Sequence, residues 1–178
     1  FTDAPVTDDT QPVENGMPKQ CHDGALDITN GSDFVSVTYN RFALHEKNTL
    51  VGGDDRAVGD RSHLRVTFKG NLFEHVSERE PRVRYGQVHL LNNYHVGDRK
   101  HPVYAHNYSV GVGIEAHIIA HANAYEIKGA RDCGQIVRAP GRSAGVHLDQ
   151  GSTLNGQPLA GHHGGLAVQR CIAGRGNA

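Results

Sequence analysis

The chain has 178 residues, in which 18 lysines and arginines nearly balance 19 aspartates and glutamates. A domain-sized chain with this charge has no overall basic field, which argues against nonspecific binding to nucleic acid or to an anionic membrane surface. No apolar run approaches the length of a membrane span. The 22 glycines and the low aromatic content of 6% are instead typical of a turn-rich protein built on β-strands.

The three cysteines, Cys21, Cys133 and Cys171, are too few for a disulfide scaffold and show no CxxC spacing for zinc. An odd number means that one thiol is unpaired within the chain or finds its partner elsewhere. The sequence does not decide which two pair.

A short template recurs four times along the chain. Two apolar residues at alternate positions are followed by an asparagine and then usually by an aromatic residue. The copies span 35–42, 66–73, 88–95 and 118–125, with their asparagines at Asn40, Asn71, Asn93 and Asn123. Strands repeated at roughly 20 to 30 residues predict a solenoid whose rungs stack on one another.

The fold expected from this repeat is all-β, a right-handed parallel β-helix with a single strand path. Asparagine tolerates the left-handed backbone conformation of a corner, and its amide can form hydrogen-bonded ladders between rungs. We therefore predict that the four asparagines lie at equivalent, largely buried corners. A β-sandwich of short strands is the alternative, although sandwiches rarely repeat a residue-specific motif.

The segments between the repeats predict the outline of a single domain over 1–178. The longer insertions, at 43–62 and 97–115, are expected to project from the coil as loops, where binding sites often lie. Residues 128–178 are rich in glycine and proline, which predicts a partial rung followed by a covering tail.

Two carboxylates, Asp23 and Asp27, flank Gly24 just before a strand. In an extended chain residues four apart face the same side, so the two side chains can converge if the chain turns at the glycine. Hard oxygen donors of this kind suit Ca²⁺ better than zinc. An Asp-Gly pair is more often simply a turn, and the residues alone leave both interpretations open.

Cationic side chains form a second candidate site. Lys47 lies in the segment HEKNTLVGG, which is not an HExxH zinc motif, and a solvated lysine is the default interpretation. The segment SEREPRVRYGQVH places Arg79, Arg82 and Arg84 around Pro81, which denies the chain a helix there. Three clustered guanidinium groups repel one another unless an anionic ligand, or the acidic neighbours Glu78 and Glu80, lies among them.

Several of these segments together resemble the pectate lyases of polysaccharide lyase family one. The resemblance runs in order from residue 21 to about residue 127, and its most specific part is the motif Arg-x-Pro-Arg-x-Arg. It is carried by DGALDIT at 23–29, VSVTYNRF at 35–42, HEKNTLVGG at 45–53, LRVTFKGNLF at 64–73 and EREPRVRYGQVHLLNNYH at 78–95.

The resemblance implies a right-handed parallel β-helix that cleaves de-esterified homogalacturonan by calcium-dependent β-elimination. Matched position by position, it implies that Asp23 and Asp27 bind calcium, that Lys47 and Arg84 hold uronate groups, and that Arg79 is the base. Arg82 matches a neighbour that supports the site and binds substrate. The implied protein is a secreted monomer whose partner is polygalacturonate, with no nucleic acid or membrane partner.

One departure from the family pattern is that a further calcium-binding aspartate, expected upstream in a segment resembling Ile-Asp-His, is missing. The resemblance therefore implies a chain that lacks its N-terminal rungs and has low activity by itself. Two other functions remain open: a pectin lyase that acts on methylated polymer without calcium, against which the Asp23/Asp27 pair argues, and a non-catalytic β-helix that binds acidic polysaccharide.

Overall fold

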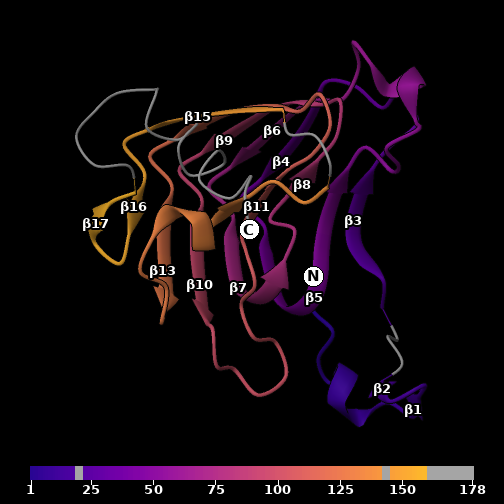
Figure 1. The fold of residues 1–178 in the computed structure, drawn as a ribbon, viewed down its shortest axis with the longest axis vertical. Coiled ribbons are helices and arrows are strands. Elements are labelled where there is room, and N and C mark those ends of the chain that lie inside the picture. The colour runs from indigo at the N-terminus through magenta and orange to yellow at the C-terminus, as the bar shows by residue number, and fades with distance from the viewer. Residues whose placement is uncertain (19–21, 142–144, 160–178) are drawn as a thin grey trace.

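The structure is a computed structural model that describes residues 1–18, 22–141 and 145–159. Its described part is built from short strands and three 3-10 helices, with no α-helix. The 3-10 helices are η1 (Asp8–Thr10), η2 (Val58–Asp60) and η3 (Cys133–Gln135). A small antiparallel hairpin of β1 (Val13–Glu14) and β2 (Met17–Pro18) projects from the N-terminal end (Figure 1).

The remaining strands wind into a coil with three faces. The first face is a five-stranded parallel sheet of β4 (Val35–Thr38), β6 (Arg65–Lys69), β9 (Gln87–Leu91), β12 (His117–His121) and β15 (Val146–Gln150). The second face contains the first half of β5 (Arg41–Val51) with β7 (Leu72–Glu78), β10 (Tyr94–Asp98), β13 (Ala124–Lys128) and β16 (Thr153–Leu154), to which β17 (Gln157–Pro158) adds an antiparallel edge.

The third face contains β3 (Gly24–Ile28), the second half of β5, β8 (Arg82–Val83), β11 (Val110–Val112) and β14 (Val137–Arg138). Figure 1 shows β3, β5, β7, β10 and β13 running side by side, with the first face behind them. All pairings between rungs are parallel, which confirms the predicted right-handed parallel β-helix.

The four asparagines form a ladder at the corner between the first and second faces, as predicted. The Asn71 backbone N–H donates to Asn93 Oδ1 at 3.0 Å, and the Asn93 N–H donates to Asn123 Oδ1 at 2.9 Å. The Nδ2 group of each of these three also donates to a main-chain carbonyl in the strand of the preceding rung: Val37, Phe68 and Leu90. The ladder begins at half-buried Asn40 and ends on Ser152, whose hydroxyl accepts from Asn123 N–H at 3.1 Å.

The backbone reason given for these asparagines was wrong. The left-handed conformation belongs to the residue before each asparagine, and to the residue before Ser152 at the end of the ladder. The φ values at Tyr39, Gly70, Asn92, Ala122 and Gly151 lie between 49° and 78°. The asparagine side chain is needed because it satisfies buried main-chain groups at the bend, where no strand partner is available.

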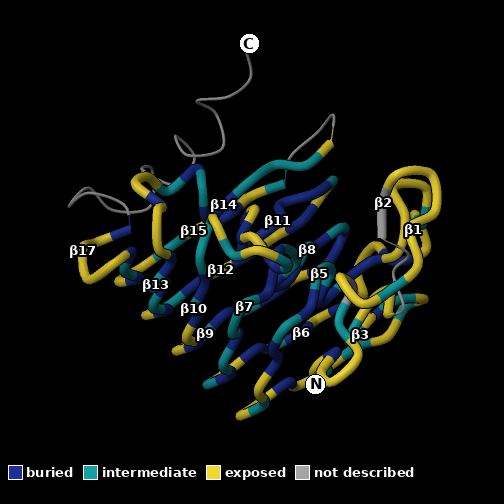
Figure 2. The backbone as a smooth tube through the Cα atoms, turned by 90° about the horizontal axis from the view of Figure 1, so that it is seen from below, coloured by how far each residue is buried: buried dark blue, intermediate teal, exposed yellow. Residues whose placement is uncertain are grey.

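The aromatic position of the template lines the interior of the coil. Phe42, Phe73, His95 and Tyr125 stack face to face, with ring centroids 4.4 to 5.1 Å apart along the series, and Phe1 continues the stack at 4.9 Å from Phe42. Figure 2 shows that burial is concentrated along the inner sides of the strands, whereas β1 and β17 are exposed.

The expected loops were placed too broadly. Residues 43–51 belong to the eleven-residue strand β5, and the loop begins only after Val51. In the second insertion, residues up to Asp98 belong to β10 and β11 resumes at Val110. The strand β5 continues through a bend at Leu44 and buries about half of its residues, so polar residues such as His45 and Asn48 are strand residues with buried side chains.

A partial rung followed by a tail was expected over residues 128–178. In this segment, β14, β15 and β16 pair with β11, β12 and β13 and continue the coil. Residues 160–178, where the covering tail was expected, lie outside the described residues.

Candidate functional site

The arginine motif lies on the third face, where β7 leads into β8. Arg79 sits in the turn with φ of +67°, and its carbonyl accepts from the Thr49 N–H at 2.7 Å. Its side chain is partly buried, and Nε lies 3.3 Å from Glu78 Oε1. Glu80, the other acidic neighbour, points into the coil instead and accepts from His95 Nδ1 at 2.6 Å. The two glutamates therefore do not share the role of neutralising the arginines.

Arg82 follows in β8, and its environment penalises its charge. Burial is the main cause that lowers the pKa of Arg82, and the neighbouring Arg84 and Arg79 lower it further. Its Nε is buried and has no hydrogen-bond partner within the described chain. Arg82 lies flat over Gly111, where a Cβ would come within 3.0 Å of its Cγ. A buried donor without a partner is costly, and on a partly buried cation it is compatible with an anionic ligand at this place.

Arg84 is held at one side by the loop that follows β5. Its Nε donates to Asp55 Oδ1 at 2.6 Å, and its Nη1 donates to the carbonyls of Gly52 and Gly53 at 3.1 and 3.2 Å. Only 11% of the Arg84 side chain is exposed. The guanidinium is therefore fixed in one orientation before any ligand arrives.

Lys47 and the two aspartates lie on adjacent strands of the same face. Gly24 of β3 is paired with Lys47 of β5, and Lys47 Nζ lies 4.0 Å from Asp23 Oδ1. Asp27 is level with Leu50, which in turn pairs with Arg82. The structure thus brings all six predicted residues to neighbouring strands of one face, which joins the carboxylate pair to the cationic group.

Asp23 and Asp27 were predicted to bind a hard cation. A Cβ at Gly24 would lie 2.6 Å from Asp27 Oδ1, so the absence of a side chain there leaves room for the Asp27 carboxylate over the glycine. The Asp23 side chain is 88% exposed, and its backbone carbonyl is held 3.1 Å from His45 Nε2. No group of three or more His, Cys, Asp or Glu side chains suited to a metal occurs among the described residues. The two carboxylates fit a hard cation but supply only part of its six to eight oxygens.

Asp3 does not complete this carboxylate pair. It is buried, with 4% exposure, and its carboxylate is hydrogen-bonded to His45 Nδ1 and to Tyr104 OH. His45 therefore links buried Asp3 to the backbone at Asp23, and helps to fix the strand that carries the carboxylates.

Sequence reasoning missed the residues that surround the arginines. Tyr108 is buried beside Arg79 and Arg82, and burial, followed by the charge of Glu78, raises the pKa of its hydroxyl to about 12. Asn107 donates from Nδ2 to Glu78 Oε2 at 2.9 Å and so ties the neighbouring loop to the turn. Both residues come from the insertion that was expected to carry a site, but no motif distinguished them within it.

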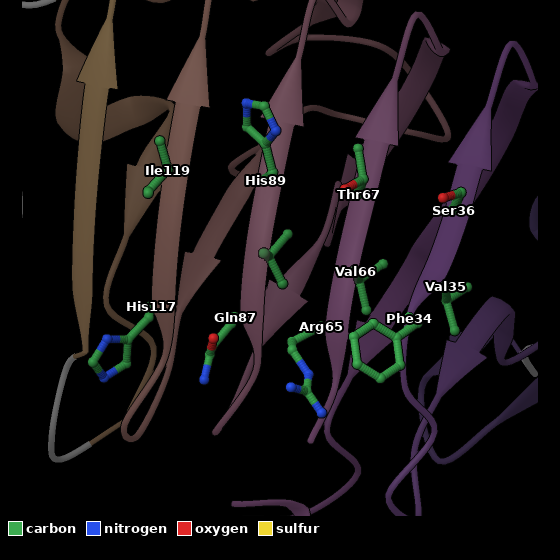
Figure 3. Close-up of a pocket in the computed structure, with 11 residues that line it drawn as sticks. Phe34, Val35, Ser36, Arg65, Val66, Thr67, Gln87, His89, His117 and Ile119 are labelled. Carbon is green, nitrogen blue, oxygen red and sulfur yellow. The ribbon is translucent and has the colours of Figure 1, made fainter. Parts of the chain in front are cut away.

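A pocket lies on a different part of the molecule, the outer side of the first face (Figure 3). Its lining includes Phe34, Arg65, Gln87, His89, His117 and Ile119. The cation there is already neutralised, because Arg65 pairs with Asp33 and lies 4.1 Å from the centre of the Phe34 ring. This pocket therefore contains one paired arginine, whereas the arginine turn gathers three arginines, one of which has a buried Nε without a partner in the described chain.

Comparison with known proteins identifies the arrangement. The family model described as pectate lyase matches residues 1–153. The chain belongs to the pectate lyase family. It is 40% identical over 164 residues to pectate lyase E of Dickeya dadantii (strain 3937), and 33% identical over 159 residues to a pectate lyase of Bacillus subtilis (strain 168). These alignments cover 88% and 89% of this chain but 40% and 37% of the relatives, so the chain spans less than half of their length.

Solved pectate lyase structures share the fold. A mutant of the Bacillus subtilis pectate lyase superposes with a TM-score of 0.87 at 28% identity, covering 97% of this chain and 41% of that one. A pectate lyase bound to a hexasaccharide superposes with a TM-score of 0.85 at 28% identity, covering 96% and 46%. The family resemblance seen in the sequence is therefore confirmed.

Cys133 is disulfide-bonded, and its partner lies outside the described residues. In the part of the chain that the structure describes, no helix is both long and apolar enough to span a membrane.

Proposed function

We propose that this chain carries the catalytic face of a secreted pectate lyase that cleaves polygalacturonate by calcium-dependent β-elimination. The observation that carries the proposal is the gathering of Lys47, Arg79, Arg82 and Arg84 on one face beside Asp23 and Asp27. A polyanion is the ligand that such a face would favour, because each guanidinium can bind a carboxylate through two hydrogen bonds.

The chemistry explains why the face needs these charges. Elimination removes the proton from C5 of a uronate, α to its carboxylate, and the negative charge that develops there is the main barrier. Lys47 and Arg84 would hold the uronate groups, and Arg82 would add fixed positive charge where the carboxylate lies. Asp23 and Asp27 would hold calcium, which when bound supplies further positive charge beside that carboxylate.

Arg79 is proposed as the base. It accepts the C5 proton, the C–H electron pair forms the C4–C5 double bond, and the C4–O glycosidic bond breaks. The leaving oxygen takes a proton from water. Arginine is a weak candidate in solution, where it deprotonates only near pH 12.5 or above. The turn presents it beside Arg82, and the charge of Arg79 is one of the causes that lower the pKa of Arg82.

A disulfide at Cys133 suits the oxidising conditions outside the cell, which supports the proposed secretion. All the proposed site residues come from one chain, so a monomer would suffice.

The decisive experiment measures absorbance near 235 nm, where the conjugated double bond of the product absorbs, on polygalacturonate with calcium and then with chelator. We expect slow turnover, because the described site offers only two carboxylates for calcium, and loss of that turnover with chelator. Binding of polygalacturonate without any absorbance change would favour a non-catalytic polysaccharide-binding domain. Turnover that prefers methylated polymer and ignores chelator would favour a pectin lyase.

The proposal also predicts an alkaline optimum. A base that is an arginine needs a deprotonated form that is scarce at neutral pH, so the rate should rise from pH 7 to pH 9 or above. The measurement is initial rate against pH at saturating substrate. A bell-shaped profile centred near pH 5 would point to carboxylate catalysis instead.

A further inference from the structure

We propose that Asp55 is a positioning residue that holds Arg84 ready to bind a substrate carboxylate. The proposal rests on the proposed function, because it takes Arg84 to be a uronate-binding residue. It adds a residue outside the arginine motif, contributed by the loop after β5.

The contacts of Arg84 are divided between its nitrogens. Asp55 accepts from Nε at 2.6 Å, and the Gly52 and Gly53 carbonyls accept from Nη1. Among the hydrogen bonds of the described residues, none is donated by Nη2. The loop therefore fixes the guanidinium through two nitrogens, and the third remains for a ligand carboxylate.

The loop is itself tied to the arginine strand. Tyr85 is buried and its hydroxyl donates to the Asp55 carbonyl at 2.5 Å, while Arg84 N–H donates to the Val51 carbonyl at 2.8 Å. A Cβ at Gly52 would lie 2.4 Å from the Arg84 carbonyl, so the close approach of loop and strand requires glycine there. These main-chain constraints fix the loop and so place the Asp55 carboxylate beside Arg84 Nε. The position of Asp55 therefore does not depend only on its own contact with Arg84.

Two effects of Asp55 on ligand binding oppose each other. A flexible arginine loses side-chain freedom on binding, which can weaken affinity by about thirtyfold, and prior ordering by Asp55 removes part of this loss. The Asp55 charge also repels a uronate bound to the same guanidinium. At about 7 Å in water this repulsion is worth only about threefold in affinity. Asp55 has 57% of its side chain exposed, so solvent screens the repulsion, and positioning should prevail.

The neighbouring Asp54 provides a matched control. It lies in the same loop, its side chain is 58% exposed, and its hydrogen bonds go to Arg56, while the charge of Arg84 is only the smallest of the causes that lower the pKa of Asp54. Asp54→Asn and Asp55→Asn thus remove the same charge from almost the same place. Only the second change affects a contact of Arg84.

The test is calorimetric binding of a galacturonate tetramer to the chain and its variants, with the melting temperature of each recorded. We expect Asp55→Ala to weaken binding about tenfold, Asp55→Asn about threefold because its amide oxygen still accepts from Nε, and Asp54→Asn not at all. The melting temperatures should agree within about 2 °C, since the altered side chains are exposed.

Tighter binding by Asp55→Ala would show that the carboxylate competes with substrate, and would overturn the proposal. Equal affinity of Asp55→Ala and the unaltered chain would overturn it as well. Arg84→Lys separates this result from the proposed function: if that variant binds the tetramer as tightly as the unaltered chain, Arg84 is not a uronate-binding residue. Weak binding by Arg84→Lys with no effect of Asp55→Ala would leave the proposed function standing and reject only the positioning role.

Discussion

The asparagine corner and the arginine turn are both bends of the same coil, but they treat buried polar groups in opposite ways. At the asparagine corner each amide is bonded to the next one, and the buried main-chain groups beside it are satisfied. At the arginine turn, like charges are gathered and Arg82 Nε is buried without a partner in the described chain. The first arrangement stabilises the coil by itself, whereas the second leaves a buried donor that the proposed ligand would satisfy.

The strongest test of this contrast is Arg79→Lys. Lysine keeps the charge but neither the position nor the geometry of the guanidinium, so elimination should fall about 10³-fold to 10⁴-fold, roughly 4 to 5 kcal/mol in the barrier. Binding of a galacturonate tetramer and the melting temperature should change little. The measurement pairs the 235 nm rate with calorimetry, and a variant that keeps more than a tenth of the activity would exclude Arg79 as the base.

A second test removes the contact that links the two regions, the hydrogen bond between buried Glu80 and His95. His95→Phe keeps a ring in the stack between Phe73 and Tyr125 but removes the donor to Glu80. Leaving that carboxylate buried and unpaired should cost about 3 to 4 kcal/mol in the free energy of unfolding, measured by urea denaturation.

The matched double variant His95→Phe/Glu80→Met replaces both partners with apolar groups. It should recover most of the loss, because no buried carboxylate then remains. If the double variant is as unstable as His95→Phe alone, the cost comes from the ring packing and not from the unpaired glutamate.

The interior also contains a polar residue that the ladder does not satisfy. His147 is fully buried, and neither ring nitrogen has a hydrogen-bond partner among the described residues. Burial lowers the pKa of His147 from 6.5 to about 4. Between these values the unfolded chain binds the proton and the folded chain does not, so stability is fully present above pH 6.5 and falls as the pH drops to 4.

His147→Leu should remove this dependence, which is worth roughly 3 kcal/mol between pH 6.5 and pH 4. Urea denaturation at pH 7, 5.5 and 4 measures it for both chains. A smaller loss in acid should remain in the variant, because burial also lowers the pKa of His106 to about 4. Identical acid destabilisation of the two chains would contradict the assignment to His147.

The smallest expected effect comes from the ladder itself. Asn93→Ala leaves the buried Asn71 N–H and the Phe68 carbonyl without their partner, and should cost about 2 kcal/mol. The control is Asn40→Ala at the end of the ladder, where the side chain is half-buried and the cost should stay below about 1 kcal/mol. Equal losses at both sites would show that burial along the ladder does not decide its energetics.

The repeat determined much of this protein without tertiary information. In the repeated template, the alternating apolar residues specify a strand and its inward face, and the asparagine specifies the corner. The coil, its asparagine ladder and its parallel pairing therefore followed from residues local in sequence. The arginine motif and the Asp23/Asp27 pair were also recognisable in advance, because both depend on short, specific spacings.

Only the tertiary structure decided which polar residues act together. Asp55 meets Arg84 across 29 residues and Glu80 meets His95 across 15, and none of these four residues except His95 belongs to the repeated template. The same is true of Ser152, which replaces asparagine at the end of the ladder, and of the strand β5, whose polar residues resembled a loop until stacking buried alternate side chains. The repeat aligns the positions that it contains, so it predicts which of those residues stack between rungs. Contacts made by residues outside the template depend instead on the lengths and paths of the loops that join the rungs, which no local pattern specifies.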